Sequence, residues 1–197
     1  MAIMKQPNRV LGLDLSLTGT GWCATSNLVT RVGIIEPGKL EGLERMDHIL
    51  KEISKLLDLT QVPFFHVSHS EEDASLPQTS ELNINETLVI IEDFSFSSKG
   101  SSLFQIAGLG YLVRHWLWEH GIKFLLVPPT MVKKFCTGTG TAQKSLILKE
   151  VYKRWNVDLT DDNEADAYVL SRIGRAYLGW DKDLTAFQRD VIDKMNK

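Results

Sequence analysis

Cysteine is scarce in this chain, which has only Cys23 and Cys136 among its 197 residues. Two cysteines cannot form a zinc cluster by themselves, and the five histidines show no ligand spacing beside them. A reduced protein without a disulfide is therefore expected. Long apolar runs are absent too, because those present, such as residues 88–91, fall far below the roughly 20 residues that span a bilayer. Since no secretory signal opens the sequence either, a cytoplasmic protein without a membrane partner is expected.

An excess of basic charge is also missing, since 22 Lys and Arg face 25 Asp and Glu and give a net charge of -3. Proteins that hold phosphate backbones usually carry surplus Lys and Arg, so this balance argues mildly against nucleic-acid binding. Carboxylates gathered around divalent cations would answer that objection, because a bound metal turns an acidic pocket into a phosphate site. With 43% hydrophobic and 24% charged residues, one globular domain with a sizeable core is expected.

The first part of the chain reads as three short strands. A buried strand starts at Val10, a Gly/Thr turn follows, and a second strand runs through Trp22 and Ala24. Residues 31–35 predict a third strand, and tight turns between the three indicate an antiparallel meander. After Pro37 the pattern becomes helical, because apolar residues recur at steps of three and four. These residues are Leu40, Leu43, Met46, Ile49, Leu50, Ile53, Leu56 and Leu57.

The rest of the chain predicts strands that alternate with helices. Residues 60–85 are polar and interrupted by two prolines, so an exposed excursion is expected there. Pro128 and Pro129 are expected to open a turn, and the tail at 180–197 is either a short docked helix or frayed. An antiparallel meander followed by alternating strands and helices implies a mixed sheet with helices on both faces. The expected elements are an apolar strand in "TLVIIEDF", a helix at 101–119, a strand in "IKFLLV", and helices at 142–155 and 164–178.

Two of the predicted strands carry acids. Asp14 interrupts "VLGLDLSL", where a strand buried on both faces should hold no charge unless the charge is paired or bound to metal. The alternative is a structural Asp that accepts hydrogen bonds from the following turn. Glu92 ends a second apolar strand, and Asp93 points to the opposite face, so only one of them can face Asp14. The alternative for Glu92 is an acid that enters solvent at the end of a strand.

A third acidic cluster, "TDDNEADAYVLSRIG", begins a predicted helix. Asp162 and Asp166 are four residues apart and Asn163 and Asp166 are three apart, so either pair shares a helix face. Helix capping offers a simpler explanation, because Asp161 and Glu164 have capping-box spacing and the helix dipole favours acids in the first turn. The combination of this cluster with the two strand acids is more informative than any one of them. Such groups can hold two divalent cations roughly 4 Å apart and support phosphodiester cleavage.

The motifs that carry these acids resemble those of the RuvC-type Holliday junction resolvases. "LGLDLSLTGTGW" is similar to the first motif of that family, "VIIEDF" to the second and "DNEADAYVL" to the terminal helix motif. In "VPPTMVKKFCTGTGTAQKSLI" one lysine precedes a Gly-rich turn and another follows it, as in the family. The resemblance covers residues 10–179 in the right order. It implies a single ribonuclease H-like nuclease domain over 1–197, of the α/β class, with an antiparallel meander followed by parallel strands.

The resemblance implies a role for each acid. Asp14, Glu92 and Asp166 would be catalytic metal ligands, for two Mg²⁺ ions per site with Mn²⁺ as a substitute. Asn163 stands where the family often has an acid or His, so either its amide oxygen or Asp162 would complete the ligand set.

The resemblance also implies groups that contact DNA. Lys133 and Lys144 would contact phosphate, and Lys144 is the stronger catalytic candidate because a fixed cation stabilises developing negative charge. Taken alone, each lysine is more readily explained as an ordinary solvated surface residue. The family places an aromatic residue after the second motif to wedge between bases, which Phe94 or, preferably, Phe96 would supply unless it belongs to the core.

The function that the resemblance implies is resolution of four-way DNA junctions by a homodimer that makes paired, symmetric nicks. Three alternatives stay open: a flap- or fork-cutting nuclease, a nuclease for RNA-DNA hybrids, and a junction-binding relative without activity. An actin-like ATPase is disfavoured because the chain has room for one domain only. "GTGTAQKS" fails the P-loop pattern at Gln143, so no nucleotide cofactor is expected. A compact chain would suit a phage or bacterial genome by analogy.

Overall fold

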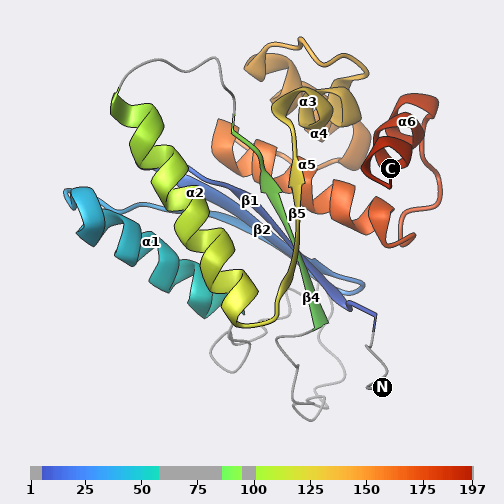
Figure 1. Ribbon diagram of the computed structural model, residues 1–197. Helices are drawn as coiled ribbons and strands as arrows, with labels where there is room; N and C mark the ends of the chain where they lie inside the picture. Colours follow the sequence, from blue (N-terminus) through green and yellow to red (C-terminus); the bar gives the residue numbers. More distant parts are fainter. Residues whose placement is uncertain (1–5, 58–85, 95–100, 197) are drawn as a thin grey trace, which may run out of the picture.

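The computed structural model describes residues 6–57, 86–94 and 101–196 (Figure 1). The excursion expected at 60–85 and the candidate Phe96 lie outside these ranges. No helix in the described ranges has both the length and the apolar character needed to cross a membrane. The elements are β1 (Arg9–Asp14), β2 (Thr20–Ser26), β3 (Thr30–Ile35), α1 (Gly42–Leu57), β4 (Thr87–Glu92), α2 (Ser101–Glu119), β5 (Lys123–Val127), α3 (Pro129–Thr137), α4 (Lys144–Trp155), α5 (Asp162–Tyr177) and α6 (Ala186–Met195).

The five strands in the described part of the chain form one mixed sheet in the order β3-β2-β1-β4-β5. β1, β2 and β3 pair antiparallel, as tight turns between short strands require. β4 pairs parallel with β1 and β5 pairs parallel with β4, each after a helical connection. The predicted antiparallel meander followed by parallel strands is therefore confirmed. In this arrangement β1 and β4 end at the same edge of the sheet.

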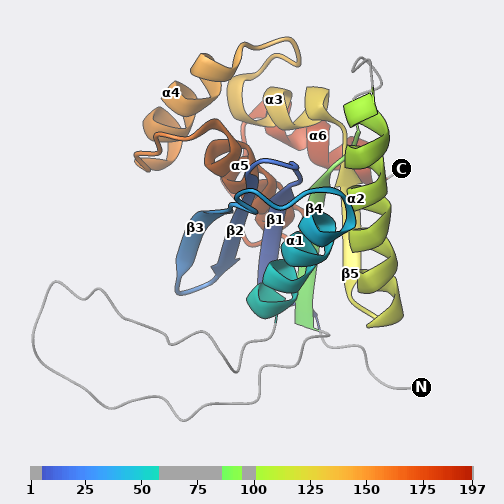
Figure 2. The same cartoon turned by 90° about the vertical axis from the view of Figure 1, so that its left-hand side faces the viewer.

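Helices cover both faces of the sheet, as predicted. On one face α1 and α2 pack against Leu11, Leu13, Val89 and Ile91, which alternate along β1 and β4. On the other face α5 packs against the intervening residues of the same strands, and α3, α4 and α6 extend that layer. Figures 1 and 2 show α3 and α4 beyond the edge where β1 and β4 end. The apolar runs of these strands follow from burial on both faces.

Helix α5 lies unusually close to the sheet because glycines face it. A Cβ atom at Gly12 would lie 2.3 Å from the carbonyl oxygen of Ala167, and one at Gly21 would lie 2.1 Å from that of Asn163. Both distances are shorter than atoms tolerate, so any side chain there would push the helix away. Gly174 plays the same part from the helix, since a Cβ there would lie 2.5 Å from a methyl carbon of Val10. These contacts place the first turns of α5 over the end of β1 and the start of β2.

The C-terminal third differs from the prediction in two respects. The sequence predicts a turn at Pro128 and Pro129, but these residues begin α3, with Pro128 as its N-cap residue. Proline suits a first helical turn because the amide it lacks would have no partner there. The expected alternation of strands and helices holds for β4, α2 and β5 but not beyond them, because four helices follow β5 in the described chain and no further strand does.

Of the two alternatives for the tail, the docked helix is correct. α6 is held by a capping box between Thr185 and Gln188, and its Val191 and Ile192 are buried in the core.

Candidate active site

Asp14 and Glu92 stand side by side at one edge of the sheet. Their strands pair in parallel with Leu13 opposite Ile91, so the next residue of each strand is its last. Leu13 and Ile91 lie in the α1/α2 core, and alternation turns Asp14 and Glu92 toward α5. Asp93 points to the opposite face, where it pairs with Arg114 of α2. This geometry agrees with the expectation that only one of Glu92 and Asp93 faces Asp14.

Asp166 reaches the same place from α5, and the three carboxyl groups interact. Burial, and next the charge of Asp166, raises the pKa of Asp14 to about 7, although Lys144 opposes the shift. The pKa of Glu92 is raised to about 8 by burial and then by the charges of Asp14 and Asp166. Burial raises the pKa of Asp166 to about 6. Three carboxyl groups that resist ionisation in this way form a site that a cation would stabilise.

Asp161, at the start of α5, caps the helix and also acts on the acidic site. The side chain of Asp161 accepts hydrogen bonds from the amides of Asn163 and Glu164 at 2.7 and 3.2 Å, so Asp161 is the N-cap residue that its spacing indicated. Its charge also raises the pKa of Asp14, a role that the capping pattern alone does not reveal.

The two candidates for a fourth ligand face different neighbours. Asp162 raises the pKa of Asp166 and so lies within its electrostatic reach. Asn163 packs against β2, where its Nδ2 would lie 3.5 Å from a Cβ added at Gly19, and its carbonyl oxygen faces Gly21. Which of the two completes the ligand set stays a prediction.

Lys133 and Lys144 supply positive charge at the carboxylates. The half-buried Lys133 of α3 and the exposed Lys144 both lower the pKa values of Glu92 and Asp166. Lys144 is the first residue of α4, a helix with no acid in its first turn and no side-chain cap on its N-terminus. A lysine at the positive end of a helix dipole is unfavourable for the helix. The helix end and Lys144 together instead suit an anion such as phosphate.

The donor set fits a hard divalent cation by its chemistry, because Mg²⁺ and Mn²⁺ prefer carboxylate oxygens. The burial and mutual repulsion of the three acids also favour a bound cation. Among the described residues, however, no three His, Cys, Asp or Glu side chains lie together at metal-ligand spacing. The carboxylates are therefore close enough to repel one another but do not form a closed cage. Metal binding by Asp14, Glu92, Asp166, Asn163 or Asp162 remains a prediction.

Phe94 is packed against α2. Its ring fills the space over Gly110, where a Cβ would lie 2.1 Å from the ring, and the guanidinium of Arg114 lies 4.5 Å from the ring centre. The ring is only partly buried, and Phe94 is not among the residues of the two core clusters. A role for Phe94 or Phe96 toward DNA stays a prediction.

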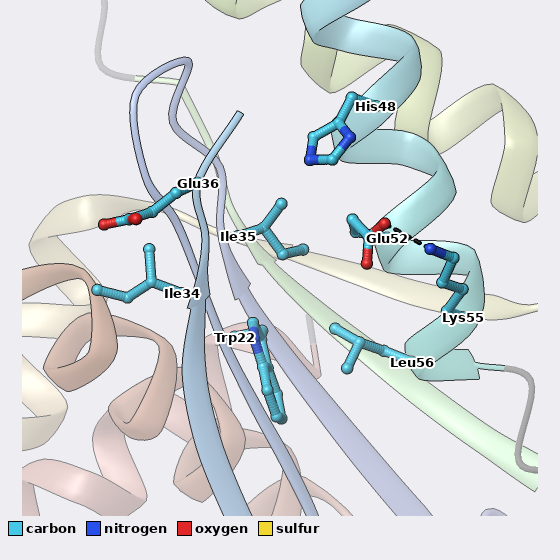
Figure 3. A pocket seen from close by; sticks show the side chains of 8 residues that line it. All are labelled: Trp22, Ile34, Ile35, Glu36, His48, Glu52, Lys55 and Leu56. Atoms are coloured by element: carbon cyan, nitrogen blue, oxygen red, sulfur yellow. Dashed lines mark hydrogen bonds and ion pairs between the residues drawn. The ribbon is translucent and has the colours of Figure 1, made fainter. Parts of the chain in front are cut away.

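A cavity of about 530 Å³ lies away from the carboxylates, between β3 and α1 (Figure 3). Glu36, His48 and Glu52 contribute to its lining, and Glu52 forms an ion pair with Lys55 at 2.6 Å. The charge of Glu52 is therefore already compensated by a lysine, whereas the carboxyl groups at the sheet edge repel one another and would be stabilised by a cation. The acidic site at the sheet edge is therefore the candidate active site.

The mixed sheet and the helices on both of its faces form a ribonuclease H-like fold, so the protein belongs to that fold class. Within that class the chain is similar to RuvC. It is 25% identical over 181 residues to the crossover junction endodeoxyribonuclease RuvC of Synechococcus sp. (strain CC9311), and the match covers 84% of this chain and 97% of that protein. No protein-family model matches the sequence.

Two solved structures of Thermus thermophilus RuvC share the fold. The first has a TM-score of 0.59 at 17% identity and covers 87% of this chain and 96% of its own. The second, a complex with a Holliday junction substrate, has a TM-score of 0.57 at 16% identity and covers 83% and 89%. The predicted resemblance to the RuvC-type resolvases is confirmed by the curated relative and these matches together.

Proposed function

We propose that the protein is a metal-dependent DNA endonuclease that resolves four-way junctions by paired, symmetric nicks. The observation that carries the proposal is the meeting of three half-buried or buried carboxyl groups, with raised pKa values, beside two lysines. The proposal is supported by the similar protein named as a crossover junction endodeoxyribonuclease and by the fold shared with a RuvC that binds a Holliday junction. Neither an actin-like nor a P-loop phosphate site explains carboxylates at this edge.

In this proposal Asp14, Glu92 and Asp166 hold Mg²⁺, or Mn²⁺ in its place. Three negative charges exceed the charge of one divalent ion and suit a pair of ions. The bound ions would supply an activated water and stabilise the leaving oxygen. Lys133 and Lys144 bind the backbone phosphate and draw it toward the carboxylates. Lys144 adds a fixed positive charge where negative charge develops, which lowers the barrier to cleavage. No nucleotide cofactor is needed for this hydrolysis.

A homodimer is part of the proposal, and the exposed face of α2 supports it. Phe104, Tyr111 and Trp118 follow one another at seven-residue intervals, and their exposed fractions are 80%, 67% and 71%. Side chains seven residues apart share one helix face, so the three form an aromatic stripe. Such stripes on a water-exposed helix usually mark an interface. A second copy of the chain would bury both stripes at once across a twofold axis.

Trp118→Glu tests this interface. We expect the variant to sediment as a monomer at concentrations where the wild type is a dimer, because a charge would be buried in an apolar contact. Paired nicks should become single nicks, since two sites would no longer be joined. Tyr152→Glu is the matched control, because Tyr152 is 57% exposed on α4 and lies outside the stripe. A dimeric Trp118→Glu protein, or equal dissociation of both variants, would refute the assignment of this face.

The function is tested by the choice of substrate and by the symmetry of the cuts. Purified protein is incubated with a four-way junction, a flap, a fork, a linear duplex and an RNA-DNA hybrid, in Mg²⁺ or in EDTA. We expect nicks at symmetric positions of the junction, only in Mg²⁺. Tight junction binding without cleavage in Mg²⁺ or Mn²⁺ would identify a binding protein instead. Preferred cleavage of the flap, fork or hybrid would keep the chemistry and change the substrate.

A further inference from the structure

The chain that leaves β4 is held by Asp93, the residue after Glu92. The amide of Asp93 donates a hydrogen bond to the carbonyl oxygen of Val127, at 2.9 Å. Its Oδ1 accepts two more, from the amide of Phe94 and from Nη2 of Arg114, each at 2.9 Å. Asp93 therefore connects the end of β4 to the end of β5 and to α2.

Arg114 holds Phe94 as well as Asp93. Its guanidinium carbon lies 4.5 Å from the ring centre of Phe94 and 5.5 Å from that of Tyr111. Only 14% of the arginine side chain is exposed, so solvent screens its charge less than in a surface pair. The tip of the Phe94 ring lies over Gly110, where no side chain would fit. Both residues that follow Glu92 are thus fixed to the same turn of α2.

These contacts bear on the position of the Glu92 carboxylate. Glu92 is the last residue of β4, beside the end of β1 that carries Asp14, so the direction of its carboxylate depends on the backbone at this strand end. Ligands of a functional site keep their geometry when neighbouring groups hold them in place. Asp93 and Arg114 hold that backbone immediately after the carboxylate.

We infer that Arg114 is a positioning residue for Glu92, acting through Asp93 and Phe94, and that it ties the acidic site to the helix that carries the aromatic stripe. The inference rests on the proposed function, because it gives Glu92 a cation to bind. Arg114 pairs with Asp93 on the face opposite Glu92, so its effect on the site is indirect. Tyr111 belongs to the aromatic stripe and its ring also faces the Arg114 guanidinium. This side chain therefore connects the stripe with the Arg114–Asp93 pair next to Glu92.

Replacing an arginine that only stabilises the fold should leave Mn²⁺ binding unchanged, and Arg172 serves as this comparison. Arg172 of α5 pairs with Asp181 at 2.9 Å and lies 5.5 Å from the ring centre of Trp155, and 24% of its side chain is exposed. It therefore combines an ion pair with an aromatic contact as Arg114 does, but with partners far along the chain from Glu92. Arg172→Gln should cost stability without affecting the site.

The experiment measures the binding of Mn²⁺ alone to wild-type protein, Arg114→Gln and Arg172→Gln. Calorimetry and the Mn²⁺-dependent rise in melting temperature are the two readouts, and neither requires cleavage. We expect Arg114→Gln to weaken Mn²⁺ binding about 10-fold, because groups that orient metal ligands typically have effects of that size. Arg172→Gln should bind Mn²⁺ like the wild type. Asp93→Asn keeps the acceptor for the Phe94 amide but loses the ion pair, and it should weaken Mn²⁺ binding in the same direction.

Arg114→Lys should restore part of the affinity, since it keeps the charge but not the planar group that stacks on Phe94. Equal Mn²⁺ affinity in the wild type and in Arg114→Gln would overturn the inference, and so would an equal loss in Arg172→Gln. If Arg114→Gln fails to fold, Asp93→Asn decides by the same criterion. A wild type that binds Mn²⁺ but cuts no junction would refute the proposed function and leave the positioning role standing. If the wild type cleaves the junction but Arg114→Gln does not change the Mn²⁺ affinity, the proposed function stands and the positioning role is refuted.

Discussion

Glu92→Gln should abolish junction cleavage and at the same time make the metal-free protein more stable. Loss of a ligand that helps hold the cation removes several kcal/mol of transition-state stabilisation, which corresponds to a rate lower by about 10³-fold or more. The gain in stability arises because the pKa of Glu92 is raised to about 8, chiefly by burial and then by Asp14. A neutral amide avoids that burial of charge and that repulsion. We expect the free energy of unfolding at about pH 8 in EDTA to rise by about 2 kcal/mol.

Glu150→Gln is the matched control for this prediction. Glu150 lies on α4 with 12% of its side chain exposed, but it is paired with Arg154 at 2.9 Å. Its replacement should lower stability through loss of the ion pair and leave cleavage within a few-fold of the wild type. Urea unfolding and single-turnover cleavage measure the two effects separately. A Glu92→Gln protein that cleaves at the wild-type rate would remove Glu92 from the catalytic site, and one less stable than the wild type would contradict repulsion among the three acids.

The sheet and its acids could be predicted because their signals are local. The period-2 alternation of β1 and β4 indicates which side chains share a face, and a carboxylate that ends a strand buried on both faces is conspicuous. The sequence alone therefore indicates that only one of Glu92 and Asp93 can face Asp14, and the register of the two strands shows that it is Glu92. Asp166 cannot be identified in this way, because helix capping explains acids at the start of that helix, and its role follows from the resemblance to the terminal helix motif of the RuvC-type resolvases.

The parts that could not be predicted depend on contacts between distant segments. Gly12 reads as an ordinary strand glycine, and only the approach of Ala167 shows why a side chain is excluded there. Likewise, no sequence spacing pairs Arg114 with Asp93, because they meet across β4 and α2. Pro129 is ambiguous because a turn and a first helical turn accept proline equally well.

The net charge of the chain predicts DNA binding poorly, because it also ignores where residues lie in the fold. The total of -3 counts every carboxylate alike, whereas those at the sheet edge would be offset by bound cations. Lys133 and Lys144 provide positive charge at the point where phosphate is proposed to bind. The distribution of charge over the fold, which a sum cannot give, is what bears on DNA binding.

Without metal, the protein should lose stability as pH rises from about 5 to about 8. The pKa values of Asp14, Glu92 and Asp166 are raised to about 7, about 8 and about 6, mainly by burial. In this window the folded state therefore binds more protons than the unfolded state, whose carboxyl groups ionise near pH 4. The free energy of unfolding must then decrease with increasing pH, by an amount on the order of 3 kcal/mol across the window. Urea unfolding in EDTA at a series of pH values measures it.

Saturating Mg²⁺ should reverse this loss, so that its stabilising effect is small near pH 5 and largest near pH 8. The reason is that the ion binds the ionised carboxylates and competes with the protons that the folded state otherwise retains. Asp190 does not interfere, because Lys134 and Lys194 lower the pKa of its carboxyl and it titrates below this window. The Cys136 thiol titrates above the window, because burial raises its pKa to about 12. Stability that is independent of pH in EDTA, or equal stabilisation by Mg²⁺ at both ends, would show that these carboxylates do not form a cation site.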